Sequence, residues 1–252
     1  MTSHQVALLG FDGMAPFELG VAVEVFALPR PELPVDWWYS FCLCVPEPGT
    51  LRVVGGFTIE APHGLDALAR ADTIVLPGTA DVHADPPEPV LAAVRAAHAR
   101  GARVLSICSG AFVLAATGLL DGLSATTHWR YAGLLQSRFP RVRVDAGVLY
   151  VDNGQIITSA GTAAGIDACL HLVRADHGAG IANRVARRMV VAPHRDGGQA
   201  QFIERPVPAA AADDPIGGTI AHTLPRLGQP ASVGDLARDA HLSVRQFSRR
   251  FA

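Results

Sequence analysis

Leu105-Ser-Ile-Cys-Ser-Gly-Ala111 is the stretch of the sequence that is most informative about the fold. It begins inside an apolar, β-branched run that predicts a buried strand over Arg103–Ile107, and a helix is predicted over Gly110–Leu120. Cys108 stands at the corner between the two. A sharp strand-to-helix turn exposes this side chain above a sheet edge, as in a nucleophile elbow, although the full Gly-x-Ser-x-Gly pattern is absent. The N–H groups that begin the helix are expected to favour a Cys108 thiolate.

Strand-like and helix-like segments alternate on both sides of this corner. The strands predicted from short apolar runs are Gln5–Phe11, Trp37–Val45, Thr73–Leu76 and Val148–Val151. Apolar residues at helical spacing predict helices over Pro89–Arg100, Ala163–His177 and Ile181–Val190, and Asp152-Asn-Gly154 predicts a hairpin turn. The alternation predicts an α/β fold with a doubly wound, mostly parallel sheet and helices on both faces. A different α/β arrangement is the alternative.

The composition is that of a folded protein with a sizeable core. Of the 252 residues, 49% are hydrophobic and 17% are charged, which excludes an intrinsically disordered chain. The four cysteines are too few and too scattered for a disulfide framework or a tetrahedral zinc set, so we expect no metal and no cofactor. No apolar stretch approaches the ~20 residues that cross a bilayer, and no basic region precedes the first apolar run. We therefore expect a cytoplasmic protein without a membrane partner.

Charge divides the chain into an acidic body and a basic end. Residues 226–252 hold five Arg and two Asp, a net charge of +3, and residues 1–225 hold 16 Arg and 21 acidic residues, a net charge of −5. A Pro- and Ala-rich segment, 205–214, has no apolar period and is typical of a linker. These features predict one domain over 1–204 and a small one over 215–252. A chance charge fluctuation in a short window is the alternative explanation of the basic end.

Candidate functional residues gather at one predicted edge of the sheet. Glu18 lies early in the helix expected to begin at Pro16, and His128 follows Thr126-Thr127. Because the carboxyl ends of parallel strands meet at one edge, we expect Glu18, Cys108 and His128 to form a pocket there. The alternative is that Cys108 is a small core residue, as free cysteines often are.

The basic end has the pattern of a helix-turn-helix. Ser232 with Asp235 comes close to a capping box, and Ser243 with Gln246 completes one, so two short helices are predicted with a tight break between them. Phe247 and Phe251 are four residues apart and are expected to share the buried face of the second helix.

The opposite face of this second helix carries the residues expected to contact double-stranded DNA. Arg245, Ser248 and Arg249 lie on this face, and an Arg can bond guanine in a bidentate manner in the major groove. Ser243 and Arg250 are expected to hold phosphate. The alternative is an ordinary helical hairpin with a solvated arginine face.

Several stretches together resemble the GlxA-like transcriptional regulators of the AraC family. The matching stretches are Phe11-Asp-Gly-Met-Ala-Pro-Phe-Glu-Leu-Gly20, Ile107-Cys-Ser-Gly-Ala-Phe-Val-Leu-Ala115, Ala125-Thr-Thr-His-Trp129 and Thr158-Ser-Ala-Gly-Thr-Ala-Ala-Gly-Ile-Asp167. The resemblance implies a PfpI-like domain with the flavodoxin-like fold of class I glutamine amidotransferases, followed by an AraC-type helix-turn-helix. It also implies that the first domain senses a small effector or forms a homodimer, and that Arg245, Ser248 and Arg249 stand at the family's base-reading positions.

Two departures from the family pattern qualify this resemblance. Ser109 stands where a His directly follows the elbow cysteine in hydrolase-like members, which counts against hydrolysis, so Glu18, Cys108, Ser109 and His128 are expected to form an effector pocket or a vestigial catalytic site. The AraC-type domain carries two helix-turn-helix units, whereas this sequence ends with the first, at Phe251-Ala252. A truncated gene product, weak DNA binding, or a dimer that supplies the second half would each account for this.

The sequence thus favours a DNA-binding transcriptional regulator over two alternatives. One is a cysteine-dependent enzyme, similar to isonitrile hydratases or amidases, that uses Cys108 and Glu18 and has a vestigial tail. The other is a sensing or dimerisation module that does not bind DNA.

Overall fold

The computed structural model describes residues 4–201, 215–223 and 231–251 and divides into two compact units, Met1–Gln201 and Phe202–Ala252. The expected linker, 205–214, lies outside the described residues, and the expected boundaries at 204 and 215 stay a prediction. Within the described ranges, no helix is both long and apolar enough to cross a membrane.

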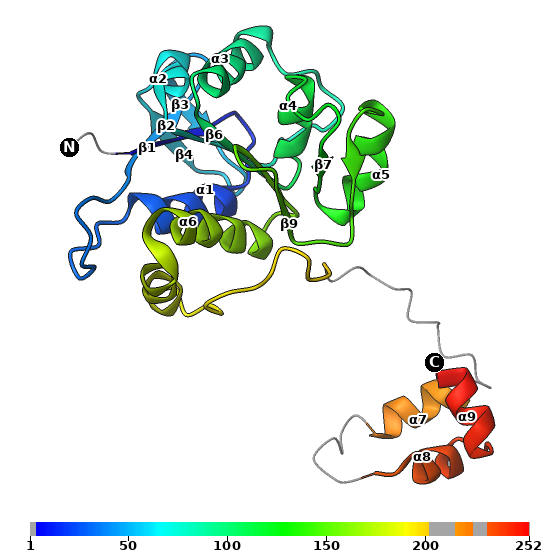
Figure 1. Cartoon of the computed structure of the whole chain (residues 1–252). Helices are drawn as coiled ribbons and strands as arrows, with labels where there is room; N and C mark the ends of the chain where they lie inside the picture. Colours follow the sequence, from blue (N-terminus) through cyan, green and yellow to red (C-terminus); the bar gives the residue numbers. More distant parts are fainter. Residues whose placement is uncertain (1–3, 202–214, 224–230, 252) are drawn as a thin grey trace. The chain divides into compact units, whose positions relative to one another are not determined.

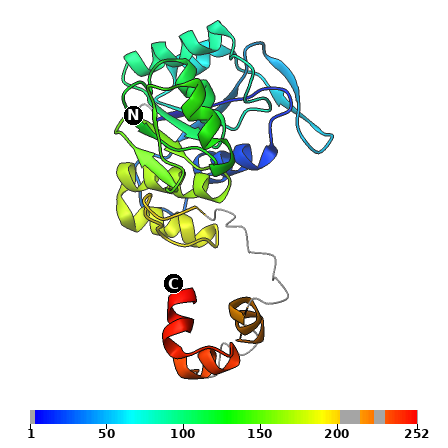
Figure 2. The ribbon, with the colours of Figure 1, turned by 90° about the vertical axis from the view of Figure 1, so that its right-hand side faces the viewer.

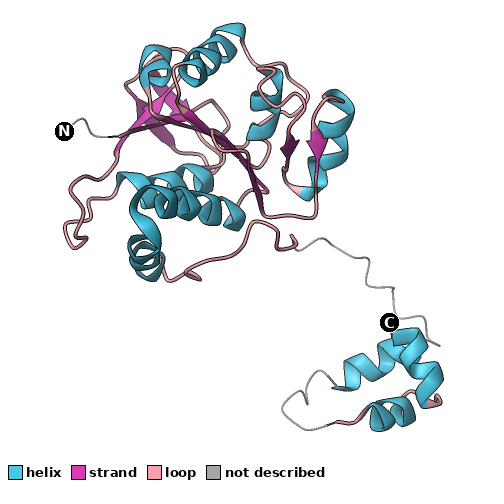
Figure 3. Cartoon of the chain, viewed as in Figure 1, coloured by secondary structure: helices cyan, strands magenta, loops and turns pink. Residues whose placement is uncertain are grey.

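The first unit is built on a six-stranded sheet with the strand order β2-β1-β5-β6-β10-β9 (Figure 3). In that order the strands are Ser40–Cys44, Gln5–Leu9, Thr73–Leu76, Arg103–Ile107, Ile156–Ser159 and Tyr150–Asp152. Every neighbouring pair is parallel except β10 and β9, which form the hairpin predicted around Asn153. The sequence-based prediction of a doubly wound, mostly parallel sheet is confirmed.

Helices cover both faces of this sheet and bury two separate apolar cores (Figure 1). On one face lie α1, the π-helical turn η1 and α6, with bounds Pro16–Ala22, Val23–Ala27 and Ala163–Arg188. On the other face lie α2, α3 and α4, with bounds Leu65–Arg70, Glu88–Ala99 and Gly110–Ala116, and α5 (Trp129–Arg138) adds Leu135 to their core. β-branched and leucine side chains of β1, β5 and β6 alternate between the two cores, which is why these central strands are apolar throughout.

Some elements depart from the predicted pattern. A hairpin of β3 (Gly49–Arg52) and β4 (Thr58–Ala61) forms a small sheet of its own at the side of the unit (Figure 2). A second small sheet pairs β7 (Ser124–Ala125) with β8 (Arg143–Val144). The two helices predicted over 163–177 and 181–190 are instead confirmed within α6, since Gly178, with a non-helical φ of +83°, separates them at the expected break.

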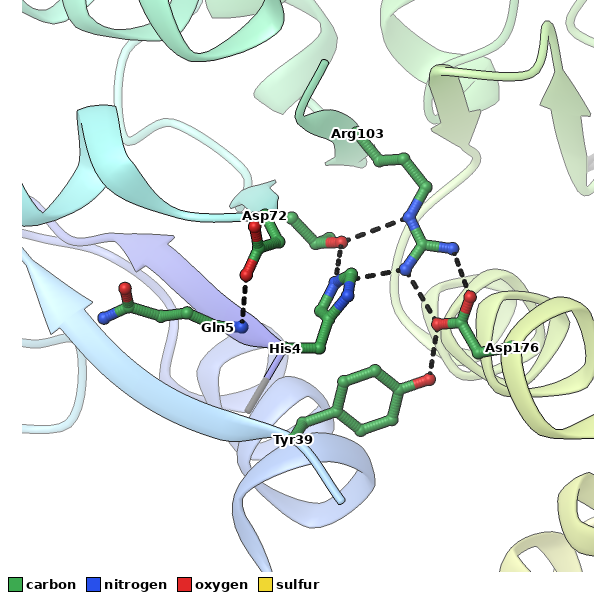
Figure 4. A network of polar contacts seen from close by, with 7 residues as sticks. His4, Gln5, Tyr39, Asp72, Arg103 and Asp176 are labelled. Carbon is green, nitrogen blue, oxygen red and sulfur yellow. Dashed lines mark hydrogen bonds and ion pairs between the residues drawn. The ribbon is translucent and has the colours of Figure 1, made fainter. Parts of the chain in front are cut away.

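A polar network ties the amino ends of the central strands to α6 (Figure 4). Arg103, at the start of β6, donates from both Nη atoms to the Asp176 carboxylate at 2.7 Å, and the Tyr39 hydroxyl donates to the same carboxylate at 2.6 Å. His4 completes the group, with its Nε2 3.2 Å from the Arg103 guanidinium. This network lies at the sheet edge opposite Cys108, because it joins strand beginnings whereas Cys108 follows a strand end.

The described residues of the second unit, 215–223 and 231–251, form three short helices around a small core. They are α7 (Pro215–Thr223), α8 (Val233–Asp239) and α9 (Val244–Phe251). Both predicted capping boxes are present. Ser232 and Asp235 exchange hydrogen bonds at the start of α8, and Ser243 and Gln246 do so at the start of α9. Each box satisfies N–H groups that a short helix otherwise leaves without partners.

Candidate functional site

Cys108 lies at a strained corner between β6 and α4. Its φ is +54°, a left-handed conformation that non-glycine residues seldom adopt and that is concentrated at functional sites. Three hydrogen bonds hold this backbone. The Cys108 N–H donates to the Ser159 carbonyl at 3.0 Å, and the Cys108 carbonyl accepts from the Thr127 hydroxyl at 2.7 Å and from the Ala111 N–H at 3.4 Å. The surrounding sheet thus fixes the corner that the sequence predicts.

Two glycines let neighbouring backbone approach this corner closely. A Cβ on Gly161 would lie 2.3 Å from the Cys108 Cβ and 3.0 Å from its Sγ, and Gly161 has a φ of +94°. A Cβ on Gly110 would lie 2.1 Å from the carbonyl oxygen of Leu76 in β5. Neither position has room for a side chain, so the loop after β10 covers Cys108 and the start of α4 packs directly on the end of β5.

Glu18 of α1 faces the same corner and is 95% buried. Its Oε2 accepts a hydrogen bond from the Gly78 N–H, in the loop after β5. Burial raises the pKa of the Glu18 carboxyl, and the N–H of Gly78, the thiol of Cys108 and the N–H of Thr162 each lower it by less. Glu18 and Cys108 therefore come together as predicted.

The predicted thiolate at Cys108 is wrong. Burial, followed by the neighbouring Glu18 charge, raises the pKa of the Cys108 thiol to about 12. The Ser109 N–H at the start of α4 lowers this pKa, but by less than the two opposing effects raise it. Burial and the adjacent carboxylate both favour the neutral thiol, and together they outweigh the one N–H at the helix start, which favours the thiolate. The thiol is therefore protonated at neutral pH.

The Ser109 side chain bonds to the loop that also holds Glu18, whereas the His128 side chain caps α5. Ser109 is 97% buried, and its hydroxyl donates to the Thr79 carbonyl at 3.2 Å, so it joins α4 to the loop after β5. The His128 ring instead caps α5, where its Nδ1 accepts from the Arg130 N–H at 3.3 Å, and it packs on Trp129. Among the described residues, no hydrogen bond or charge interaction joins His128 to Cys108 or Glu18. The expectation that His128 shares their pocket is therefore not supported by these contacts.

Sequence reasoning missed the backbone groups that line the Cys108 pocket. A Cβ on Gly78 would lie 3.0 Å from Glu18 Oε2 and 3.1 Å from Ser109 Oγ, so this glycine lets the loop after β5 approach both side chains. Thr162, with a φ of +45°, follows Gly161 and contributes its N–H to Glu18. The signal in the sequence was a glycine two residues after the end of a strand, Gly78 after β5 and Gly161 after β10. In the described part of the chain, no three His, Cys, Asp or Glu side chains gather as a metal site.

The second candidate site is the outer face of α9. Its candidate DNA-contacting residues are all solvent-exposed, namely Ser243, Arg245, Ser248, Arg249 and Arg250. None of the three arginines has an ion-pair partner within 231–251 or the other described ranges, whereas Arg238 of α8 pairs with Asp235. The arrangement leaves three cationic side chains free in solvent on one short helix.

Phe247 is the buried side chain on the inner face of α9 in the described part of the second unit. Phe247 is 3% exposed and meets Ala237 and Ala240 of α8. Phe251 stacks on Phe247 with ring centroids 5.4 Å apart, but it is 57% exposed. The prediction that both rings are buried is thus wrong for Phe251, because the described helices of this small unit cover only one of them.

The sequence pattern of the DJ-1/PfpI family matches residues 4–175. Among named relatives, the HTH-type transcriptional regulator CdhR of Pseudomonas aeruginosa is 30% identical over 208 residues, which cover 81% of this chain and 60% of CdhR. Isonitrile hydratase of Pseudomonas putida is 37% identical over 123 residues, which cover 48% of this chain and 53% of the hydratase. The matches thus span little more than half the length of either relative.

Among solved structures, an AraC family transcriptional regulator from Pseudomonas putida has the same fold as the first unit. It superposes with a TM-score of 0.64 over 74% of this chain and 99% of that chain, at 19% sequence identity. At this identity the likeness concerns the fold alone.

Proposed function

This chain belongs to the DJ-1/PfpI family, and from that premise we propose that it is a transcriptional regulator of the GlxA-like AraC type that binds DNA through α9. Several of its relatives are named HTH-type transcriptional regulators, among them CdhR and GlxA. In this proposal the first unit senses a small effector and forms a homodimer, and the second unit reads the major groove of double-stranded DNA.

The observation that carries the proposal is the exposed, unpaired arginine face of α9. A cation held in an ion pair has to break that pair before it neutralises a phosphate, whereas Arg245, Arg249 and Arg250 have no such pair in the described structure. The capping box at Ser243 and the buried Phe247 fix the helix from its other side. In the proposal, Arg245, Ser248 and Arg249 contact base edges, and Ser243 and Arg250 contact phosphate.

A mobility-shift titration with the DNA upstream of the gene tests this proposal. We expect the double variant Arg245→Ala/Arg249→Ala to bind this DNA at least tenfold more weakly and to lose most of its preference for it over unrelated DNA, because each base contact of an Arg is worth about 1 to 3 kcal/mol of discrimination. The matched control is Arg184→Ala/Arg187→Ala, which removes the same charge from exposed positions of α6. Equal weakening in both variants, or no shift of the wild-type protein at low salt, would contradict the proposal.

An enzyme remains the second candidate, because Cys108 and Glu18 are in contact and one relative is named isonitrile hydratase. Burial and the neighbouring Glu18 raise the pKa of the Cys108 thiol, which makes it a weaker nucleophile and so favours the regulator. Turnover of isonitriles or simple amides that disappears in Cys108→Ser would establish the enzyme instead. If neither turnover nor DNA binding is found, a sensing or dimerisation module without DNA binding is the remaining reading.

A further inference from the structure

A cavity opens at the same edge of the sheet as Cys108, but on the face covered by α3 and α4. Its volume is about 230 Å³, and its walls include Leu9, Phe11, Thr79, Val90, Phe112 and Val113. Neither Cys108 nor Glu18 is part of this lining. We propose that this cavity is a binding site for a small, uncharged apolar molecule, such as a substituted benzene.

The walls supply the apolar surface that such a molecule needs. Leu9, Phe112 and Val113 are core side chains from β1 and α4, each less than 10% exposed, so they present a fixed surface. Three prolines complete the rim, Pro46, Pro86 and Pro87, and proline has no backbone N–H to offer a polar ligand. A site of this composition binds by the removal of apolar surface from water.

The polar side chains of the lining are engaged within their own loop. Among the described residues that line the cavity, only Thr79 and Asp81 have polar side chains. The Thr79 hydroxyl donates to the Asp81 carbonyl at 2.8 Å, and Asp81 Oδ1 accepts from the His83 N–H at 2.8 Å. Asp81 is exposed at the rim, where water solvates its charge. The interior therefore lacks a charged partner for a charged ligand.

The volume sets the size of the ligand. An engineered protein cavity of about 150 Å³ lined by Leu, Ile and Phe stays dry and binds benzene. The present cavity is larger at about 230 Å³, so it accommodates a benzene ring with one or two substituents.

The loop after β5 connects this cavity to the Cys108 site. Thr79 lines the cavity, its carbonyl accepts the hydrogen bond from Ser109, and the adjacent Gly78 N–H holds Glu18. A molecule packed against Thr79 thus lies one residue from the group that positions the Glu18 carboxylate. The inference that this molecule is the effector rests on the proposed function. The inference that the cavity binds an apolar molecule does not depend on it.

Calorimetric titration of the full chain with toluene, and with benzylammonium as its charged analogue, tests the site. The variants Ala84→Phe, at the exposed rim, and Val113→Phe, in the wall, each fill part of the cavity. Ala92→Phe makes the same kind of change at an exposed position of α3 outside the lining and serves as the matched control. Thermal melting by circular dichroism verifies that each variant folds, and the exposed Ala84 keeps the test valid should Val113→Phe fail to fold.

We expect toluene to bind the wild-type protein and Ala92→Phe equally, to bind the folded cavity-filling variants at least tenfold more weakly, and benzylammonium not to bind. The site is refuted if toluene does not bind the wild type, if filling the cavity leaves its affinity unchanged, or if benzylammonium binds as tightly. DNA is absent from this titration, so its outcome is independent of the proposed function. If toluene binds as expected but the mobility shift fails, the regulator is refuted and the site stands.

Discussion

Replacing Gly110 with alanine tests how closely α4 packs on the end of β5. Gly110 is the first residue of α4, two residues after Cys108. A Cβ at this position would lie 2.1 Å from the carbonyl oxygen of Leu76 and 2.8 Å from that of Pro77. Both contacts are with backbone, which cannot rotate away as a flexible side chain can. The helix and the strand therefore have to separate to admit one methyl group.

The expected loss in the free energy of unfolding is about 2 kcal/mol. Overpacking a rigid site costs about 1 to 3 kcal/mol, and the fixed carbonyl places Gly110→Ala at the upper end of that range. Alanine returns at most about 1 kcal/mol of helix propensity relative to glycine. For a unit of this size, a net loss of about 2 kcal/mol lowers the Tm by about 4 to 8 °C.

Thermal and urea unfolding followed by tryptophan fluorescence measures this change. All three tryptophans, Trp37, Trp38 and Trp129, belong to the first unit, so the signal reports on that unit alone. Gly133→Ala in α5 is the matched control, since a Cβ there would meet nothing within 4 Å. This control is expected to be more stable than the wild type by up to about 1 kcal/mol. A Gly110→Ala protein that melts at or above the wild-type temperature would refute the close packing of α4 on β5.

Three further predictions concern other parts of the molecule. Glu18→Gln removes the charge that helps to raise the pKa of Cys108, so the thiol should be alkylated by iodoacetamide faster at pH 8 to 9, as followed by mass spectrometry. Arg103→Ala should lower the free energy of unfolding by about 2 kcal/mol at pH 7. The pKa of Asp176 is lowered in the folded state, so its ion pair stabilises the fold above the usual pKa of 3.8, and the difference from wild type in urea unfolding should shrink as the pH falls through and below that value. Ser243→Ala removes the capping box of α9 and should cost about 1 kcal/mol, seen as about fivefold faster hydrogen exchange of the α9 amides.

Each of these changes has a matched control. Glu24→Gln removes a carboxylate from the turn that follows α1, and it should leave Cys108 alkylation unchanged because Glu24 does not act on that thiol. Arg52→Ala breaks an exposed ion pair with Asp12 and should cost less than about 1 kcal/mol. Ser248→Ala changes a serine of α9 outside the cap and should not speed exchange. Slower alkylation in Glu18→Gln, a pH-independent loss in Arg103→Ala, or unchanged exchange in Ser243→Ala would contradict the respective argument.

Local sequence patterns were sufficient to predict most of the fold and part of the candidate site. Apolar runs located the central strands, and the strand-to-helix turn located Cys108, because both features depend on residues adjacent in the sequence. The alternation of strands with helices indicated a parallel sheet, and parallel strands in turn brought Glu18 to the edge where Cys108 lies. Both capping boxes were predicted for the same reason, since their partners are three residues apart.

Tertiary contacts decided what those patterns left open. The pKa of Cys108 depends on burial and on Glu18, which comes from a helix 90 residues earlier in the chain. The sequence showed only the N–H groups at the helix start, and these predicted a lowered pKa where the structure has a raised one. The ring of His128 turned to cap α5, and Phe251 stayed exposed although its spacing from Phe247 fits a buried face. The apolar cavity beside the Cys108 site arises from segments of β1, the loop after β5, α3 and α4 that only the fold brings together. Sequence spacing determines which residues share a helix or strand and which face they share. Parts of the chain that are distant in sequence determine how deeply each residue is buried, which charges surround it and whether a cavity remains beside it.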